Sequence, residues 1–138
     1  MSVKSSSGGA VAGLTSAGVQ QLLFRKTSAD MQSTADQVFT KVYGGTNYFV
    51  TAIVARQRTG GATVACAGGI YTGAAKTGDQ IVAVAQSWVT LAAAVIVQAT
   101  VAALVGTNLE SSTPFLSLTT GSTAACTADI YIYGFDIT

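Results

Sequence analysis

The last twelve residues, TADIYIYGFDIT (residues 127–138), constrain the fold more than any other stretch of the chain. Aliphatic and aromatic side chains alternate there with a period of two, which indicates a β-strand because successive side chains leave opposite faces. One face carries Ala128, Ile130 and Ile132, and the other carries Tyr131, Tyr133 and Phe135. Since both faces are apolar, we expect protein on both sides of the strand. We assign the aliphatic face to a core between two sheets and the aromatic face to a subunit interface, and the opposite assignment stays open.

Short β-branched and aromatic runs continue upstream, separated by glycine pairs and polar turns. We expect strands at residues 19–26, 37–42, 48–56, 63–67 and 81–85, from residue 95, and at 115–119 and 127–138. Roughly seven to nine short strands with such close turns favour an all-β fold, a jelly-roll-like antiparallel β-sandwich. Another Greek-key sandwich has the same spacing, so the strand order stays open. Residues 17–138 are expected to form this single β-sandwich domain.

Residues 1–16 are rich in Ser, Gly and Ala and have little to bury, so we expect a flexible N-terminal arm. Such an arm either remains a tail or reaches onto a neighbouring subunit. Lys4 is followed by SSSGG and not by an apolar run, so no secretory signal is predicted and the protein is expected in the cytosol or released by lysis.

The pattern also predicts local detail within the sandwich. In the strand at 48–56, Tyr48, Val50, Ala52 and Val54 are expected on one face, and Phe49, Thr51, Ile53 and Ala55 on the other. The glycine pairs at 60–61 and 68–69 are expected to break strands, and residues 72–80 to form a polar loop.

Charged residues make up only 9% of the chain, and the mean hydropathy is +0.48. A typical soluble domain is about 25% charged, so much of this surface is expected to be buried against partners. Residues 91–105 are a candidate membrane span, but they are short and interrupted by Gln98 and Thr100. We therefore expect no membrane partner, and instead a strand whose small side chains let another sheet approach closely. A net charge of +1 also argues against a nucleic-acid partner.

The chain offers little catalytic chemistry. It contains no His, and its six acidic residues are scattered along the sequence. Ser-His-Asp and Cys-His arrangements are therefore impossible, and the glycine pairs lack the spacing of a phosphate-binding loop. We expect a protein that is not an enzyme and binds neither a metal nor a cofactor. Cys66 and Cys126 are expected to be buried thiols, with a disulfide between neighbouring strands as the alternative.

Four further side chains stand out, and three of them, Trp88, Arg56 and Arg58, are candidates for a binding surface. Trp88 is the only Trp, expected to anchor the core or its rim, with an interface or a stacking platform for a sugar as the alternative. Arg56 and Arg58 lie where a strand leaves the core, and they are either solvated or paired with an acidic partner surface. Asp129 needs a partner if it is buried and ionised, and Arg56, Lys76 or a neighbouring subunit could supply one.

Three stretches carry a resemblance to a known group of proteins. They read STADQVFTKVYGGTNYFVTAIVARQ (residues 33–57), GGIYTGAAKTGDQIVA (68–83) and FLSLTTGSTAACTADIYIYGFDI (115–137). Together they resemble small virion structural proteins of tailed bacteriophages, over about residues 20–138. The shared pattern is one of strand-like sequence without a chemical motif, so no functional residue can be transferred.

The resemblance implies a jelly-roll-like sandwich with a structural role in the virion. Within that group it favours a capsid cement or decoration protein, which is commonly a homotrimer seated where major capsid protein subunits meet. The alternative is a tail or spike/fibre component that binds a receptor or a carbohydrate. Either protein would be assembled in the host cytoplasm, with the capsid favoured over the tail as its location.

Overall fold

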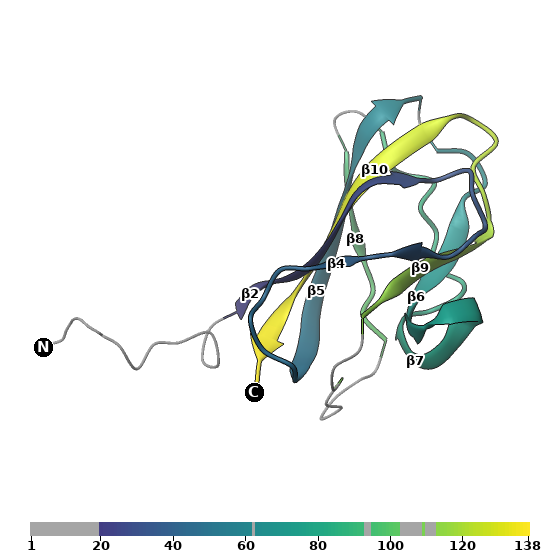
Figure 1. Ribbon diagram of the computed structural model, residues 1–138. Coiled ribbons are helices and arrows are strands. Elements are labelled where there is room, and N and C mark those ends of the chain that lie inside the picture. Colours follow the sequence, from purple (N-terminus) through teal and green to yellow (C-terminus); the bar gives the residue numbers. More distant parts are fainter. Residues whose placement is uncertain (1–19, 62, 93–94, 103–108, 110–112) are drawn as a thin grey trace, which may run out of the picture.

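The computed structural model describes residues 20–61, 63–92, 95–102, 109 and 113–138, and in it two antiparallel sheets pack face to face (Figure 1). The five-stranded sheet has the order β4 (Thr40–Lys41), β2 (Gln20–Asp30), β10 (Cys126–Asp136), β5 (Tyr48–Gly60) and β8 (Ile96–Ala99). The four-stranded sheet has the order β3 (Gln37–Val38), β9 (Phe115–Thr120), β6 (Ala67–Gly73) and β7 (Thr77–Val82). Apart from one 3-10 turn, η2 (Ala74–Lys76), the named elements of the described chain are all strands. The predicted all-β sandwich is confirmed, and the predicted arm at residues 1–16 lies outside the described residues.

The strand pairing is nested, which settles the strand order that the sequence left open. β2 pairs with β10, β3 with β9, β5 with β8, and β6 with β7, all antiparallel. The chain is thus one long hairpin, rolled so that β10 also pairs with β5 and β9 also pairs with β6. This nesting is the jelly-roll arrangement, in which eight strands form two sheets.

Two segments cross between the sheets and close the sides of the sandwich. β3 belongs to the four-stranded sheet and β4 to the five-stranded sheet, and the buried Phe39 lies between them. The single strand predicted at residues 37–42 is therefore split, because its two halves pair in different sheets. On the other side, Val101 forms a bridge with Val82, and the Ala102 N–H donates to the Ile81 carbonyl at 2.8 Å. These crossings leave β8 as a four-residue edge that pairs only with β5 in the described part of the chain.

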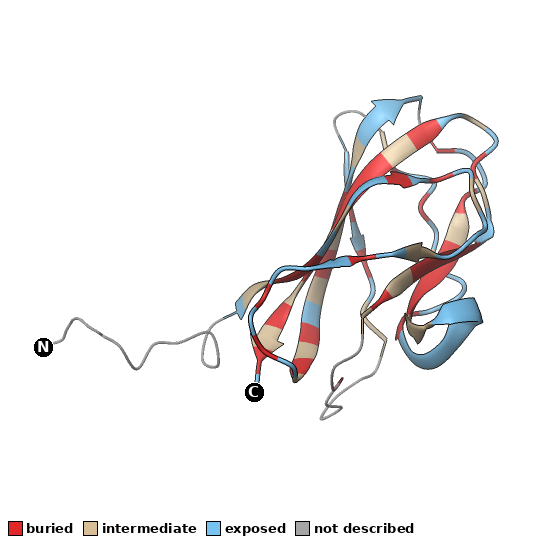
Figure 2. Cartoon of the chain, in the orientation of Figure 1, coloured by how far each residue is buried: buried red, intermediate tan, exposed pale blue. Residues whose placement is uncertain are grey.

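The core between the sheets contains the aliphatic face of β10. Ala128, Ile130 and Ile132 are all 0% exposed, so their predicted place in the core is confirmed. Figure 2 shows the alternation along β10, where buried and half-buried residues follow one another. At one end of the core, the rings of Phe24 and Tyr48 meet edge to face with centroids 5.0 Å apart. Such edge-to-face pairs stabilise a core beyond the area they bury.

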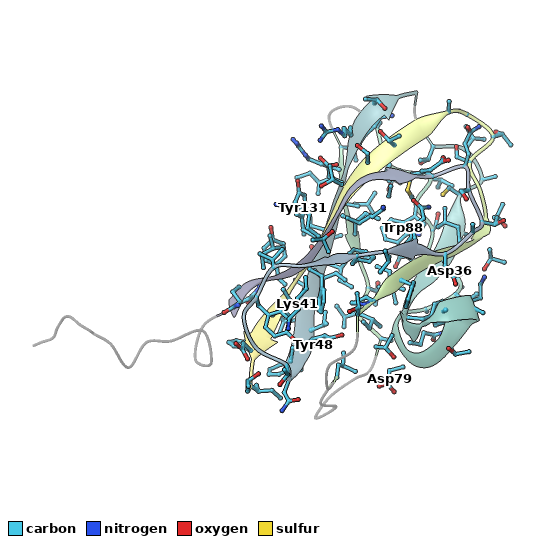
Figure 3. All side chains as sticks on the ribbon, in the orientation of Figure 1. Asp36, Lys41, Tyr48, Asp79, Trp88 and Tyr131 are labelled. Atoms are coloured by element: carbon cyan, nitrogen blue, oxygen red, sulfur yellow. The ribbon has the colours of Figure 1, made fainter. Side chains whose placement is uncertain are left out.

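Trp88 lies in the same core and has no exposed surface (Figure 3). Its indole Nε1–H donates to the Gly68 carbonyl at 3.1 Å, which satisfies the one polar atom of the ring. The core assignment of Trp88 is thereby confirmed. The alternatives of an interface anchor or a sugar-stacking platform are wrong for this structure, because no face of the ring is accessible.

Strict alternation along β5 fails at one residue. Tyr133 pairs with Ala52 and Gly134 pairs with Val50, so Thr51 is an extra residue on β5. This β-bulge shifts the facing of all later residues. Tyr48, Val50, Ile53 and Ala55 are buried, whereas Phe49, Ala52 and Val54 are half-buried on the opposite face. The predicted face assignment is therefore correct before the bulge and wrong after it.

Two predicted breaks also differ from the structure. Gly68 and Gly69 lie inside β6, where a Cβ on Gly68 would come within 2.3 Å of the Leu118 Cα. Glycine is needed here for close strand approach and not for a turn. Residues 72–80 are predicted to form a polar loop, but residues 77–80 belong to the strand β7. These four residues are polar because they are exposed to solvent. Gly60, with a φ of +94°, ends β5 as predicted.

Residues 91–105 are described only in part, and the described part includes β8, which confirms a strand near residue 95. Among the described residues, no helix is long and apolar enough to cross a membrane.

Gly134 provides a test of the β5 bulge at Thr51, because it lies opposite that bulge on β10. A Cβ at this position would lie 2.0 Å from the Phe49 carbonyl oxygen, whereas nothing lies within 4 Å of a Cβ on Gly44. We expect Gly134→Ala to lower the free energy of unfolding by about 1–3 kcal/mol, the usual cost of overpacking. Gly44→Ala should change it by less than about 0.5 kcal/mol. Urea denaturation of the two variants gives the comparison, and equal stabilities would contradict the assigned register.

Candidate functional site

The aromatic face of β10 forms the middle of a continuous surface on the outside of the five-stranded sheet. Residues that are cross-strand partners share a face, so the pairing of β10 with β2 and β5 defines this surface. We call it the outer face, and it consists of Leu22, Arg25, Phe49, Ala52, Val54, Arg56, Arg58, Asp129, Tyr131, Tyr133 and Phe135. The predicted interface residues Tyr131, Tyr133, Phe135, Arg56 and Arg58 are therefore brought together on one surface.

The apolar part of the outer face is half-buried, and no second sheet of the described chain lies over it. Tyr131, Tyr133 and Phe135 are each of intermediate exposure. The rings of Phe49 and Phe135 stack across the strands, with centroids 5.1 Å apart and an interplanar angle of 25°. Val54 lies beside Tyr131 in the same cross-strand row. The outer face thus presents ordered, packed aromatic rings to its surroundings.

The other sheet differs in that its outer side is covered. Leu116, Ser117 and Leu118 of β9 are successive residues and all are buried, so both faces of this strand are shielded. The Lys76 Nζ, from the η2 turn, donates to the Ser117 hydroxyl at 3.1 Å. Lys76 is therefore not the partner of Asp129, one of the alternatives that the sequence left open. The contrast between the sheets makes the outer face the main open apolar surface of the described sandwich.

Asp129 is the one buried acid of the outer face, with a side chain only 3% exposed. Its Oδ1 accepts a hydrogen bond from the Ser28 backbone N–H at 3.0 Å. Its Oδ2 accepts one from the Arg58 guanidinium at 3.2 Å, and the Arg56 guanidinium lies 3.6 Å from the same oxygen. The side chains of Arg56 and Arg58 remain 61% and 46% exposed respectively. A buried carboxylate needs this combination of charge and hydrogen bonds to offset its lost hydration.

Two β-bulges on either side of β10 build this carboxylate site. Between the pairs Ala128–Ala29 and Ile130–Lys26, the strand β2 has one residue more than β10, and Ser28 there has a φ of +53°. On the other side, Arg58 is the extra residue of β5. Bulges leave ladder groups unpaired and redirect side chains. Here Asp129 accepts from the N–H of one bulge and from the side chain of the other.

The sequence named Arg56 as one partner of Asp129, but Arg58 and Ser28 were missed as partners because bulges depend on pairing. Arg25 and Phe49 were also missed as members of the outer face. For Phe49 the sequence did contain a signal, because the alternation of residues 48–56 places Phe49 on the face opposite the core residue Tyr48. Arg25 has no such signal, because only its pairing with Tyr131 places it on this surface.

The two cysteines lie away from the outer face, and both are buried and free, as predicted. Burial raises the pKa of Cys66 to about 11 and the pKa of Tyr43 to about 12, and the charge of Asp136 adds to the latter shift. Within the described residues, no three His, Cys, Asp or Glu side chains are grouped so as to hold a metal ion.

Replacing the buried carboxylate should destabilise the fold. In Asp129→Asn the ion pairs with the two arginines are lost, and we expect the free energy of unfolding to fall by about 2 kcal/mol, the order found for hydrogen bonds to charged groups. Asp79→Asn is the matched control, since Asp79 is exposed on β7 and should change stability by less than about 0.5 kcal/mol. Urea denaturation near pH 7 measures both, and an Asp129→Asn variant as stable as the control would refute the role given to Asp129.

The raised pKa values predict a loss of stability in alkali. Folding keeps Cys66 protonated up to about pH 11, against an ordinary pKa of 9.0, so its contribution is complete below pH 9 and is lost as the pH rises to about 11. Tyr43 adds a similar loss between its ordinary pKa of 10.0 and about 12. Urea midpoints should therefore fall across this range, and less steeply in Cys66→Ala. A midpoint that stays constant up to about pH 11 would count against this prediction.

Comparison with known proteins gives no relative from which a role for this surface could be transferred. No protein-family model, no curated protein and no solved structure matches the chain. The function must therefore be argued from the chain's own residues.

Proposed function

We propose that this protein is a non-catalytic structural component of a tailed-bacteriophage particle, a capsid cement or decoration protein that binds between major capsid protein subunits. The observation that carries the proposal is the outer face, an open surface of ordered Tyr and Phe rings flanked by arginines. Tyr, Phe and Arg are the residue types enriched at protein interfaces, whereas Lys, Glu and Asp are depleted there. The resemblance of residues 20–138 to virion proteins supplies the biological setting.

The energetics of a cement protein fit such a surface. A protein that binds only the assembled shell stabilises it by mass action, in proportion to the logarithm of its free concentration over Kd. Low charge favours this role. A charged side chain loses its hydration when a contact buries it, and only pairing with an opposite charge offsets that cost. On the outer face the single acid is already paired within the chain, so Asp129 brings no unpaired charge to the contact. We infer a homo-oligomer, with a trimer favoured, whose copies use the outer face for contacts with one another or with the shell.

The tail or fibre alternative differs in its ligand. A carbohydrate-binding tip requires an accessible aromatic face, and Trp88 is fully buried. Tyr131 and Tyr133 are partly exposed, so these two side chains, and not Trp88, would be the ones to contact a sugar in a tail protein. A mass-spectrometric inventory of purified heads against purified tails separates the two locations, and recovery of the protein in tails alone would overturn the capsid assignment.

Substituting the tyrosines tests the surface directly. We expect Tyr131→Ser and Tyr133→Ser each to weaken self-association or shell binding roughly tenfold, because buried aromatic anchors carry much of the energy of an interface. Val84→Ser is the control, since Val84 is 44% exposed and is not part of the outer face. Sedimentation velocity measures the oligomer, and co-sedimentation with undecorated shells measures binding. Unchanged oligomer mass and unchanged shell binding in both tyrosine variants would rule out the outer face as the contact surface.

A further inference from the structure

The stretch between Asp79 and Glu110 contains no Lys, Arg, Asp or Glu. It nevertheless contributes four of the eight large hydrophobic residues that are exposed in the described chain, namely Val84, Val89, Val95 and Ile96. Ile96 is the most exposed of them, at 66%. Neither the core nor the outer face accounts for this exposure. An uncharged stretch with exposed aliphatic side chains is atypical of a surface that meets only water.

This stretch supplies β8, the edge strand next to β5. Its burial alternates, with Ile96 and Gln98 exposed and Val97 and Ala99 buried. A sheet edge presents unpaired backbone N–H and C=O groups, and proteins usually protect it with charges, Pro, bulges or very short strands. β8 has no charged residue and no Pro, and its register with β5 runs without a shift over all four pairs.

The other edges are protected in the ways that β8 is not. β3 and β4 are two residues long, and the chain crosses between the sheets at Phe39. β7 carries Asp79, and its end is bridged by Val101. The part of β2 that β4 leaves unpaired carries Lys26 and Asp30 and contains the bulge at Ser28. Among the edges of the described chain, β8 alone has none of these features, so an edge-to-edge contact between two copies pairs β8 with β8.

We propose that β8 is a self-association edge, which pairs antiparallel with β8 of a second copy across a two-fold axis and joins two five-stranded sheets into one. Identical edges can meet in this way because an isologous contact places the same strand on both sides of the axis. The pairing satisfies the backbone groups of β8 that have no strand partner in the described chain, and it sets Ile96 and Gln98 of both copies on one continuous surface. That surface continues the outer face, because Ile96 pairs with Arg56 and Gln98 with Val54. The inference goes beyond the proposed function and does not depend on where the protein acts.

A charge placed on the edge tests the proposal. Ile96→Lys puts a cation on each side of the two-fold axis while leaving the core intact, so we expect the Kd of the two-fold dimer to rise roughly tenfold or more. Val84→Lys is the control, since Val84 is exposed in the same uncharged stretch and lies outside β8. Sedimentation equilibrium over a range of protein concentrations measures both variants against the parent chain. A parent chain that stays monomeric throughout, or equal effects of the two lysines, would overturn the proposal.

Cross-linking gives the geometry independently. Single cysteines introduced at positions 95 to 99 should form intermolecular disulfides most readily at the residue nearest the two-fold axis, and less readily on either side. The native Cys66 and Cys126 are buried and will not compete. Repeating the scan in Tyr131→Ser separates the two surfaces, because cross-linking that persists there belongs to the β8 edge and not to the outer face. The absence of a maximum along the strand would count against antiparallel pairing, even if the chain associates through another surface.

Discussion

The pairing of β10 on both sides is the constraint on which the rest of the molecule depends. Buried backbone N–H and C=O groups must find partners, and a central strand can find them only on its two neighbours. β10 pairs from end to end with β5 and along most of its length with β2, so the last strand closes the sheet against the first described strand. The pairing of β10 with β2 joins residues about 100 positions apart. Contacts so distant in sequence slow folding, by the usual relation of folding rate to contact separation.

Irregularities in this pairing produce the chemistry of the outer face. A perfectly regular ladder would leave Asp129 among apolar neighbours with one cross-strand partner, Arg56. The bulge at Ser28 adds a free N–H, and the bulge at Arg58 adds a second guanidinium. The buried carboxylate of Asp129 therefore holds Arg56 and Arg58 in place before any partner binds. Their positions are preorganised, which lowers the entropic cost of any contact they make.

The sequence predicted what depends on local pattern and missed what depends on partners. The core positions of β10 followed from simple alternation, because no bulge lies on that strand itself. The faces of β5 were predicted correctly only up to Thr51, since the bulge there exists because Gly134 lets the Phe49 carbonyl approach. The sequence predicts a strand break at Gly68 and Gly69, because a glycine pair has the same appearance whether it interrupts a strand or allows close packing within one. The outer face was half predicted, with its β10 residues named and Arg25 missed.

The scarcity of charge acquires a structural explanation from the way the sandwich is closed. Crossings between the sheets close the two sides of the sandwich, and the η2 turn contacts the outside of the four-stranded sheet. What remains open in the described chain is the outer face and the uncharged edge at β8, and the two are continuous through the pairs of β8 with β5. A monomer would normally protect such a surface with Lys and Glu, at the cost of desolvating them in any complex. The distribution of charge thus fits the proposal that other protein completes the five-stranded sheet.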